Sequence, residues 1–370
     1  MSRLFESAAI GSMTLRNRFV RSATWEAMAT PAGEVTPRLV ETTAALARGG
    51  VGLIISGHAY IRPEGQAGPG QLGAYGDKLV PGLRRMAAAA HDHGAKILLQ
   101  LAHAGYLAAE TLTGRPPLAV SASVKLDDTP RRQMSAADID ELVAAFAAAA
   151  ARAKEAGFDG VQIHSAHGYC LNQFLSPLFN RRQDEYGGTL ENRVRVHLET
   201  IRAVRRAVGG DFPILVKING RDFADGGLEL HDSAAAAQLM EQAGLDAVEL
   251  SSGMARFSKL GSARTGITNQ KKEAYNREEA KALRERLRIP LILVGGIRSL
   301  PVAERLVAEN ICDFISMSRP FIREPDLVNR WASGDRRKAA CTSDNLCYGP
   351  ARSGEGLYCV TAAKRKKAGA

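Results

Sequence analysis

The segment from Asp159 to Arg193 reads DGVQIHSAHGYCLNQFLSPLFNRRQDEYGGTLENR, and its local order decides the fold. It opens with a short run, Gly160–Ser165, in which apolar and polar residues alternate, as is typical of a strand. A loop rich in polar side chains follows and ends in a turn at Gly187-Gly188. Thr189 then has the hydroxyl that an N-cap requires for the helix beyond it. The segment therefore predicts a strand, a polar loop and a helix.

The same order of strand, loop and helix extends to both ends of the chain. Strands rich in Val, Ile and Leu that alternate with helices imply parallel pairing through crossover helices. The predicted strands are Arg18–Ala23, Gly52–Gly57, Lys96–Leu101, Gly160–Ser165, Pro213–Asn219, Ala247–Ser252, Leu291–Gly296 and Asp313–Ser318. The predicted helices are Pro37–Ala47, Pro81–His93, Ala136–Ala156, Leu190–Val208, Asp232–Ala243, Arg277–Arg286 and Pro301–Glu309.

Eight strand–helix units favour a closed (β/α)8 TIM barrel over a doubly wound sheet. A doubly wound sheet of this size usually has a glycine fingerprint after its first strand, but Thr-Trp-Glu follows at residues 24–26. Barrels place their active sites on the face formed by the loops that follow the strands. The longest irregular segments each follow a strand and are therefore expected on that face: Ala59–Tyr75, Gly105–Met134 and Gly253–Asn276.

The C-terminal part of the chain differs from the rest. Phe321–Trp331 is predicted as the last helix of the barrel, and the residues from about Ala332 onward are polar and broken by glycine. We therefore divide the chain into a barrel, residues 1–335, and a short cysteine-containing tail, residues 336–370. The basic run Lys364–Lys367 within this tail is interpreted as solvated or disordered rather than as a nucleic-acid arm.

Composition narrows the class of protein. The 370 residues are 45% hydrophobic and 24% charged, which is typical of a globular protein with a substantial core. No apolar run is long enough to span a membrane, and the first residues lack the apolar core of a secretion signal, so a cytoplasmic location is expected. The five cysteines are then expected as thiols. The net charge of +10 is scattered through predicted helices and would also suit an anionic cofactor or substrate.

The last two predicted strands end in residues that suit a phosphate. Gly295-Gly296 ends strand seven, and Ser318-Arg319 ends strand eight. In barrels the loops after these strands commonly bind phosphate through backbone N–H groups, which glycine leaves accessible. Arg319 adds a guanidinium that can bind a phosphate through two hydrogen bonds. A tight turn beside a surface arginine is the alternative, and the pairing of the two motifs favours phosphate.

Two other strand ends carry polar side chains that would meet at the same mouth. Gln100 offers both a donor and an acceptor to the edge of a heterocyclic ring. Lys217 needs an anionic partner there, either a carboxylate or a ligand that gains negative charge. Each alone is as consistent with a structural role. Together with the phosphate site, they favour a phosphorylated heterocycle across the mouth.

The loop of the opening segment carries His164, His167 and Tyr169. The two imidazoles are three residues apart and could bind a metal, but we see no third ligand at matching spacing, and a core role for one of them is a further alternative. We favour two donors that hold a substrate oxygen where negative charge develops. Tyr169 is then the candidate proton donor.

Three motifs resemble the old yellow enzyme family of flavin oxidoreductases, above all HSAHGYCLNQFLSPLFNRRQDEYGGTLENR at 164–193. The others are LRNRFVRSAT at 15–24 and QLAHAG at 100–105. The resemblance covers residues 4–335 and looks closest to the flavin barrels of 2,4-dienoyl-CoA reductase and trimethylamine dehydrogenase. It implies a barrel that binds FMN without a covalent bond.

The resemblance also implies roles for individual residues. His164 and His167 would bind the oxygen of an electron-withdrawing group, and Tyr169 would protonate the substrate. NADH or NADPH would pass a hydride to flavin N5 and leave, and an activated alkene would then take it at its β carbon. The implied cofactor contacts are Ser22, Ala23, Thr24, Trp25, Gly57 and His58 beside the ring, Gln100 at the pyrimidine edge, Lys217 at N1 and O2, and Gly295, Gly296, Ser318 and Arg319 at the phosphate.

This chain departs from the family pattern at several positions. Trp25 stands where many relatives have threonine or cysteine, Tyr106 replaces an arginine, Cys170 replaces a leucine, and Ser318 replaces a glycine. The tail resembles a segment that binds an iron–sulfur cluster, but Asp344 replaces the second of four cysteines, and the others are Cys341, Cys347 and Cys359. Because such clusters normally take four thiolates, a tail with free thiols is favoured over a bound cluster.

The leading hypothesis is therefore an FMN-dependent ene-reductase that uses NADH or NADPH. A flavin dehydrogenase or demethylase of an amine-type substrate, a non-catalytic flavin-binding barrel and a phosphate-binding barrel enzyme without flavin are the alternatives. A small-molecule substrate is expected, without a nucleic-acid or membrane partner, and a homo-oligomer is compatible with the sequence. The identity of the substrate does not follow from these residues.

Overall fold

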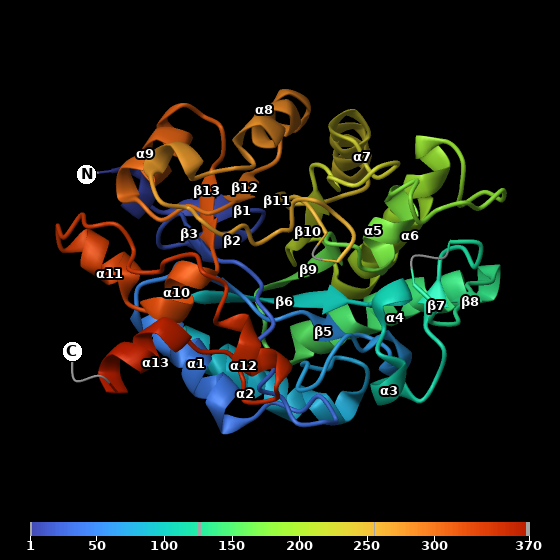
Figure 1. Cartoon of the computed structure of the whole chain (residues 1–370), viewed down its shortest axis with the longest axis horizontal. Helices are drawn as coiled ribbons and strands as arrows, with labels where there is room; N and C mark the ends of the chain where they lie inside the picture. Colours follow the sequence, from blue (N-terminus) through green and yellow to red (C-terminus); the bar gives the residue numbers. More distant parts are fainter. Residues whose placement is uncertain (1, 125–126, 255, 368–370) are drawn as a thin grey trace.

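The computed structural model describes residues 2–124, 127–254 and 256–367. Eight parallel strands close into a barrel because β4 pairs with both β3 and β6, which joins the two ends of the sheet. The predicted (β/α)8 barrel is confirmed (Figure 1). Its strands are β3 (Phe19–Arg21), β4 (Leu53–Ile55), β6 (Lys96–Ala102), β9 (Gly160–Ser165), β10 (Ile214–Asn219), β11 (Ala247–Ser251), β12 (Leu291–Val294) and β13 (Phe314–Met317).

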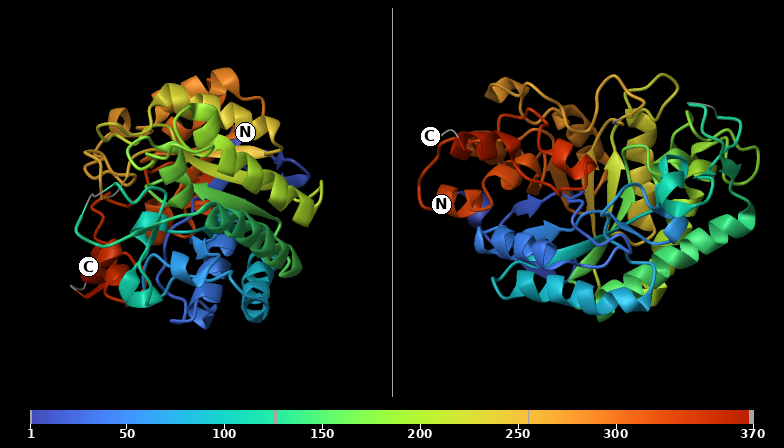
Figure 2. Two further views of the ribbon diagram at one scale, coloured as in Figure 1. Left: turned by 90° about the vertical axis from the view of Figure 1, so that its right-hand side faces the viewer. Right: turned by 60° about the horizontal axis from the view of Figure 1, so that its bottom comes forward.

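Helices surround the strands on the outside of the barrel (Figure 2). Three of them begin at a side-chain cap: Thr36 precedes Pro37 at the first helix, Ser135 forms a capping box with Asp138, and the predicted cap Thr189 accepts a hydrogen bond from the backbone of the next turn. The outer helices are α1 (Pro37–Arg48), α2 (Val80–His91), α4 (Ala136–Glu155), α6 (Leu190–Val208), α7 (Leu230–Gln242), α8 (Arg277–Arg286) and α9 (Leu300–Ala308).

An N-terminal hairpin, which the sequence analysis did not predict, closes the bottom of the barrel. Its strands β1 (Ala8–Ile10) and β2 (Met13–Leu15) pair antiparallel. They pack Ile10, Met13 and Leu15 into one buried apolar cluster with side chains from inside the barrel, such as Val20 and Phe314. Fully burying side chains of this size stabilises a fold by about 1.5–3 kcal/mol each. The barrel is therefore sealed below, and ligand space is left at the carboxyl ends of its strands.

The predicted last helix, Phe321–Trp331, is wrong as a single element. The structure has α10 (Arg319–Arg323) and α11 (Leu327–Ala332), separated at Pro325. The residue before a proline is pushed out of the helical region, and Glu324 has φ −136° and ψ 85°. Shorter elements occupy the predicted irregular segments: β5 (Ala59–Tyr60), α3 (Glu110–Thr113), β7 (Leu118–Ala119), β8 (Arg132–Gln133) and the 3-10 turns Pro63–Gly65, Gly105–Leu107 and Gln270–Lys272. Outside those segments lie α5 (Cys170–Leu175) and the 3-10 turns Arg3–Phe5 and Asp77–Leu79.

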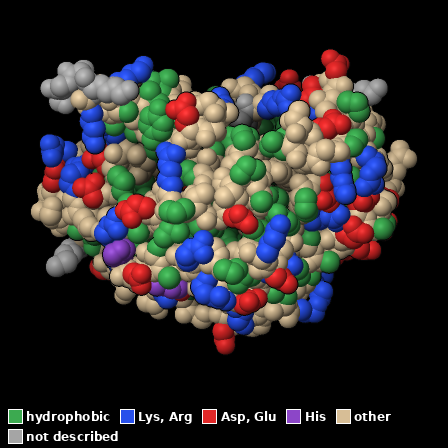
Figure 3. All heavy atoms as spheres, turned by 90° about the horizontal axis from the view of Figure 1, so that it is seen from below, with side chains coloured by type: hydrophobic (Ala, Val, Ile, Leu, Met, Phe, Trp, Pro, Cys, Tyr) green, Lys and Arg blue, Asp and Glu red, His purple; other side chains and the backbone are tan. Residues whose placement is uncertain are grey.

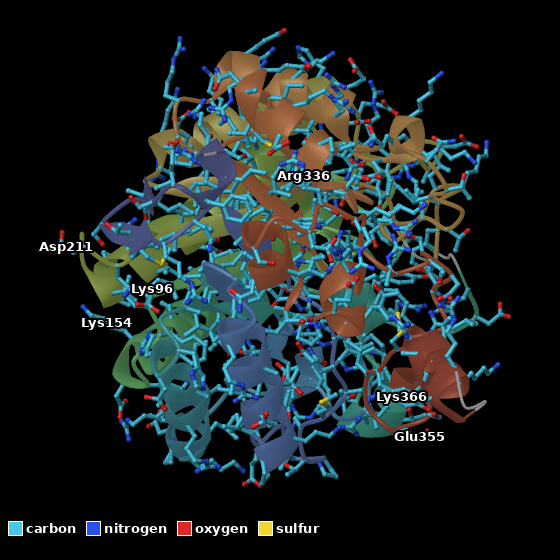
Figure 4. All side chains as sticks on the ribbon, turned by 90° about the vertical axis from the view of Figure 1, so that its left-hand side faces the viewer. Lys96, Lys154, Asp211, Arg336, Glu355 and Lys366 are labelled. Atoms are coloured by element: carbon cyan, nitrogen blue, oxygen red, sulfur yellow. The ribbon has the colours of Figure 1, made fainter. Side chains whose placement is uncertain are left out.

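The C-terminal segment folds back over the mouth of the barrel and contains α12 (Tyr348–Arg352) and α13 (Val360–Lys367). The backbone N–H of Leu357 donates to the carbonyl of Glu26, which follows the first barrel strand. In Figure 4, Lys96 at the start of β6, Asp211 before β10 and Lys154 near the end of α4 are on the left, and Glu355 and Lys366 lie on the opposite side. The tail thus contacts the face where the strands end. Its separation as residues 336–370 stays a prediction.

The surface carries both signs of charge. On the face shown in Figure 3, basic and acidic side chains are interspersed. The basic residues 364–366 lie exposed on α13. Within the described residues, no helix combines the length and hydrophobicity that crossing a membrane requires.

Candidate functional site

Two adjoining cavities lie at the carboxyl ends of the strands. The larger encloses about 1820 Å³, including space open to solvent, and the smaller about 570 Å³. Both are lined by Ala23, His167, Lys217 and Tyr348, so they form one continuous site. The predicted residues Thr24, Trp25, His58, Gln100, His164 and Tyr169 line only the larger cavity, and Ser22, Gly296, Ser318 and Arg319 line only the smaller one. Gly57 and Gly295 line neither.

The smaller cavity contains three of the four predicted phosphate residues, Gly296, Ser318 and Arg319. Gly296 has φ +68°, and a Cβ there would lie 2.7 Å from a ring carbon of Tyr275, so only glycine fits. The hydroxyls of Ser318 and Thr24 lie 2.7 Å apart. The buried Arg319 donates through Nη1 to the backbone carbonyl of residue 264 at 2.8 Å and to Asn345 at 2.7 Å. A fixed guanidinium, two hydroxyls and an uncovered backbone can bind an anionic group.

Glu26 and the backbone of Thr24 leave no room for a side chain at Gly57. A Cβ at Gly57 would lie 2.2 Å from Oε2 of Glu26. Glu26 in turn lies 3.8 Å from the guanidinium of Arg21. The expected contact of Gly57 with the cofactor ring stays a prediction. The expected contact of Gly295 with the phosphate also stays a prediction, and Gly295 lies against Asn276.

A buried network forms the floor beneath both cavities, with Glu249 at its centre. This fully buried carboxylate accepts hydrogen bonds from Ser22 and Ser316 at 2.7 Å and from Gln162 at 2.8 Å. Nζ of Lys217 lies 3.2 Å from it. Burial alone would raise the pKa of Glu249, but the Lys217 ammonium and the hydrogen bonds hold it below its ordinary value. Glu249 is thus the anionic partner that Lys217 needs.

Sequence reasoning missed Glu249 and Gln162. The signal was present, because each is a polar residue within an apolar barrel strand, in AVELS at 247–251 and GVQIHS at 160–165. Gln162 also orients Gln100, whose Nε2 donates to the Oε1 of Gln162 at 2.6 Å. The carbonyl oxygen of Gln100 is therefore the group it offers to a ligand as a hydrogen-bond acceptor.

The predicted catalytic residues come together at the other end of the larger cavity. The rings of His164 and His167 have centroids 5.4 Å apart, and those of His164 and Tyr169 are 4.8 Å apart. Nε2 of His167 lies 2.8 Å from the hydroxyl of Ser251, and the Tyr169 hydroxyl lies 3.1 Å from Nε2 of His58. Nδ1 of His164 is buried and has no hydrogen-bond partner among the described residues. A polar atom that is buried without a partner favours a ligand that supplies one.

Backbone geometry aims these side chains. His167 has φ +62°, a conformation that L-residues rarely adopt, and its backbone N–H donates to Asn219 at 3.2 Å. Strain of this kind persists only where the surroundings impose it. The sharp turn allows His164, at the end of β9, and His167, beyond it, to point into one cavity.

Burial sets the protonation states. It lowers the pKa of His167 to about 3 and that of His58 to about 4, and it lowers the pKa of His164 well below its ordinary value. Burial also raises the pKa of Tyr169 to about 12. At neutral pH the three imidazoles are therefore uncharged and the phenol is protonated. Such a set donates hydrogen bonds to an oxygen and keeps a proton available.

The C-terminal segment supplies site residues that the sequence analysis did not predict. Tyr348 lines both cavities, Asn345 and Arg352 line the larger one, and Asn345 fixes Arg319 as described above. No local motif marks them, because their role depends on contacts with residues more than 300 positions away, such as Trp25. The predicted barrel alone thus forms only part of the site.

The cysteines of the tail surround a separate small cavity. Cys341, Cys347 and Cys359 line it together with Asp344, whose carboxylate accepts hydrogen bonds from Thr342 and Thr361, both at 2.7 Å. Across the described ranges, no group of three or more His, Cys, Asp or Glu side chains is arranged to hold a metal ion. Three thiols and an engaged carboxylate do not match the four-thiolate set of an iron–sulfur cluster. That the tail holds free thiols rather than a cluster stays a prediction.

Comparison with known proteins identifies the group to which this architecture is similar. The NADH:flavin oxidoreductase / NADH oxidase family matches residues 3–338. A metal reductase of Desulforamulus reducens is 40% identical over 336 residues, which are 90% of this chain and 49% of that protein. The structure of a 2-naphthoyl-CoA reductase in complex with 2-naphthoyl-CoA has a TM-score of 0.90 at 26% identity and covers 96% of this chain and 56% of its own.

A shorter structure shows the same likeness. The old yellow enzyme homologue from Zymomonas mobilis has a TM-score of 0.77 at 26% identity, over 92% of this chain and 95% of its own. The chain spans about half the length of the metal reductase and somewhat more than half of the 2-naphthoyl-CoA reductase. The resemblance inferred from three motifs is confirmed.

Proposed function

This chain belongs to the NADH:flavin oxidoreductase / NADH oxidase family, and we propose that it binds FMN and uses NADH or NADPH to reduce an activated carbon–carbon double bond. The observation that carries the proposal is the convergence of His164, His167 and Tyr169 on the cavity that also contains Gln100 and Lys217. Donors to an oxygen, a protonated phenol and a heterocycle-binding edge then face one another.

The donor set fits FMN along the whole site. Arg319, Ser318 and the uncovered backbone at Gly296 would hold the phosphate in the smaller cavity. The carbonyl oxygen of Gln100 would accept from the pyrimidine edge of the ring, and Lys217 would offset negative charge on its N1 and O2 side. Lys217 lines both cavities and so adjoins the phosphate residues, and Gln100 lines the larger cavity together with the imidazole pair.

When bound, FMN would supply hydride transfer from the nicotinamide to the β carbon of the alkene. His164 and His167 would donate hydrogen bonds to the oxygen of the electron-withdrawing group, where negative charge grows as the hydride arrives. Because the imidazoles are uncharged, their N–H groups polarise this oxygen without protonating it. Tyr169 would deliver its proton to the α carbon. Trp25 and Tyr348 would flank the ligand and limit the entry of water.

The visible spectrum of the purified protein tests this proposal. We expect a yellow protein that retains FMN, bleaches with NADH or NADPH under anaerobic conditions and regains its colour with an enone such as 2-cyclohexenone. A colourless protein that takes up no added FMN would disprove the cofactor assignment. Bleaching by nicotinamide without recovery by any of several enones and enoates, while an amine reduces the flavin, would instead support the amine dehydrogenase alternative.

A further inference from the structure

The mouth of the larger cavity carries two arginines that the proposed chemistry does not use. Arg256 comes from the long segment that follows β11, and Arg352 is the last residue of α12 in the C-terminal segment. They line the same cavity as His164 and Tyr169, although 96 positions separate them in the chain. Two segments distant in sequence thus bring positive charge to one opening.

The charge at this opening is not balanced by the cavity itself. None of the described residues that line the cavity is an aspartate or a glutamate. The third cation there, Lys217, is paired with Glu249 below the floor. The guanidinium of Arg352 has no hydrogen bond or ion pair within the part of the chain that the structure describes, and its side chain is exposed. An unpaired cation at a cavity wall attracts an anionic ligand.

Arg256 has only a shared partner. Its side chain is 59% exposed and lies 3.0 Å from the carboxylate of Asp127. The same carboxylate accepts two hydrogen bonds from Arg131, so one negative charge faces two guanidinium groups. Asp127 does not line the cavity. A net positive charge therefore remains on the Arg256 side of the opening.

We propose that Arg256 and Arg352 select oxidising substrates that carry an anionic group, a carboxylate or a phosphate, at the end remote from the reacting double bond. The inference rests on the proposed function, because the imidazole pair must hold the reacting end deep in the cavity. The remote end of the same molecule then extends towards the opening, where the two arginines lie. The phosphates of the nicotinamide reductant share this chemistry and form the second arm of the test.

A matched pair of ligands isolates the charge. The enone 7-oxooct-5-enoate and its methyl ester have the same reacting group and differ in one remote charge, and the saturated 7-oxooctanoate and its ester bind without reacting. We expect wild-type protein loaded with FMN to bind the saturated acid about tenfold more tightly than the ester in isothermal titration calorimetry, as is usual for a charge-assisted hydrogen bond. The preference should decrease as salt is added.

Substitution then locates the effect. Arg256→Gln and Arg352→Gln should each reduce the acid-to-ester ratio of binding constants, and the double variant should bring it close to one. The acid-to-ester ratio of kcat/KM for the enone and its methyl ester should decrease in the same variants. Arg206→Gln, at an exposed position near the end of α6, is the matched control and should keep the wild-type ratio. Because the ratio is measured within each variant, a change in folding stability does not affect it.

Three outcomes would overturn the inference. The first is wild-type protein that binds acid and ester equally, and the second is a double variant that keeps the full preference. The third is a double variant whose only defect is slower flavin reduction by NADPH, which would assign the arginines to the reductant. If the acid preference depends on the arginines but the enone is never reduced, the anion site stands and the proposed function fails.

Discussion

Replacing Glu249 by glutamine tests whether charge holds the floor of the site together. The carboxylate is fully buried, accepts three hydrogen bonds and lies 3.2 Å from Nζ of Lys217. Glutamine keeps the shape of the side chain but removes its charge, and its amide NH2 cannot accept a hydrogen bond. Lys217, itself buried, would lose its counter-ion.

The structure permits an estimate of the cost. Removing one partner of a buried ion pair destabilises a protein by about 3–5 kcal/mol, because the other charge stays buried and unpaired. For 370 residues, the unfolding entropy near 60 °C is about 0.8 kcal/mol/K. The melting temperature of Glu249→Gln should therefore fall by about 4–6 °C.

Thermal melts of the FMN-free protein, followed by circular dichroism, measure this change. Adding Lys217→Met should recover part of the loss, since the unpaired ammonium is then gone, whereas Ser316→Ala, which removes one hydrogen bond, should cost only about 1–2 °C. If the double variant loses the sum of the two single losses, the residues are not coupled and the reasoning is refuted.

The same pair predicts a dependence on pH. Burial by itself raises the pKa of Glu249, and the net lowering comes from Lys217 and the hydrogen bonds. Because folding lowers the pKa of Glu249, its charged form stabilises the fold at pH values above its ordinary pKa of 4.5. This stabilisation is lost as the pH falls through the lowered pKa. The difference in melting temperature between wild type and Glu249→Gln should therefore shrink below about pH 4.5.

Three further substitutions test the proposed cofactor site and the tail. Tyr169→Phe should slow reoxidation of the reduced flavin by an enone by about 10²–10⁴-fold, with little effect on flavin reduction by NADPH; equal losses in stopped-flow traces of both half-reactions would exclude Tyr169 as the proton donor. Gly296→Val, which would place its Cβ 2.7 Å from the Tyr275 ring, should weaken FMN binding at least tenfold in a fluorescence titration, and unchanged affinity would argue against the phosphate site. We expect Asp344→Cys to incorporate iron and acid-labile sulfide and the wild type to contain neither, and equal iron content in both proteins would show that the aspartate is not what prevents a cluster.

The elements of the barrel could be predicted because local signals agree with the tertiary structure. The ranges Gly160–Ser165, Leu190–Val208 and Arg277–Arg286 match the structure to the residue. In each case the apolar period and the turn or cap chemistry indicate the same boundaries. The prediction of one helix at 321–331 failed because it continued through Pro325, and local stereochemistry does not permit a proline in the middle of a helix.

Site residues could be predicted from the sequence where they lie near the end of a predicted strand. Gln100, His164 and Lys217 lie at or near the carboxyl ends of buried strands, and a barrel brings such ends together. The partner of Lys217 could not be derived in this way. The choice of Glu249 depends on the register between β10 and β11, in which these two residues are directly paired, and register is a property of the assembled sheet.

Trp25 and the C-terminal tail both depart from the family pattern, and the structure shows that they belong together. Trp25, which stands where relatives have a smaller residue, packs against a cluster of Cys347, Ala351 and Leu357 from the C-terminal segment. Most apolar residues of the tail are alanine or cysteine, and its large ones are only Leu346, Tyr348, Leu357, Tyr358 and Val360. So few large apolar side chains predict no packing of their own. On the surface of a barrel that presents a tryptophan beside the cavity, the same residues have a partner. The large indole and the tail are therefore one structural feature, and it places Tyr348 and Arg352 in the lining of the larger cavity.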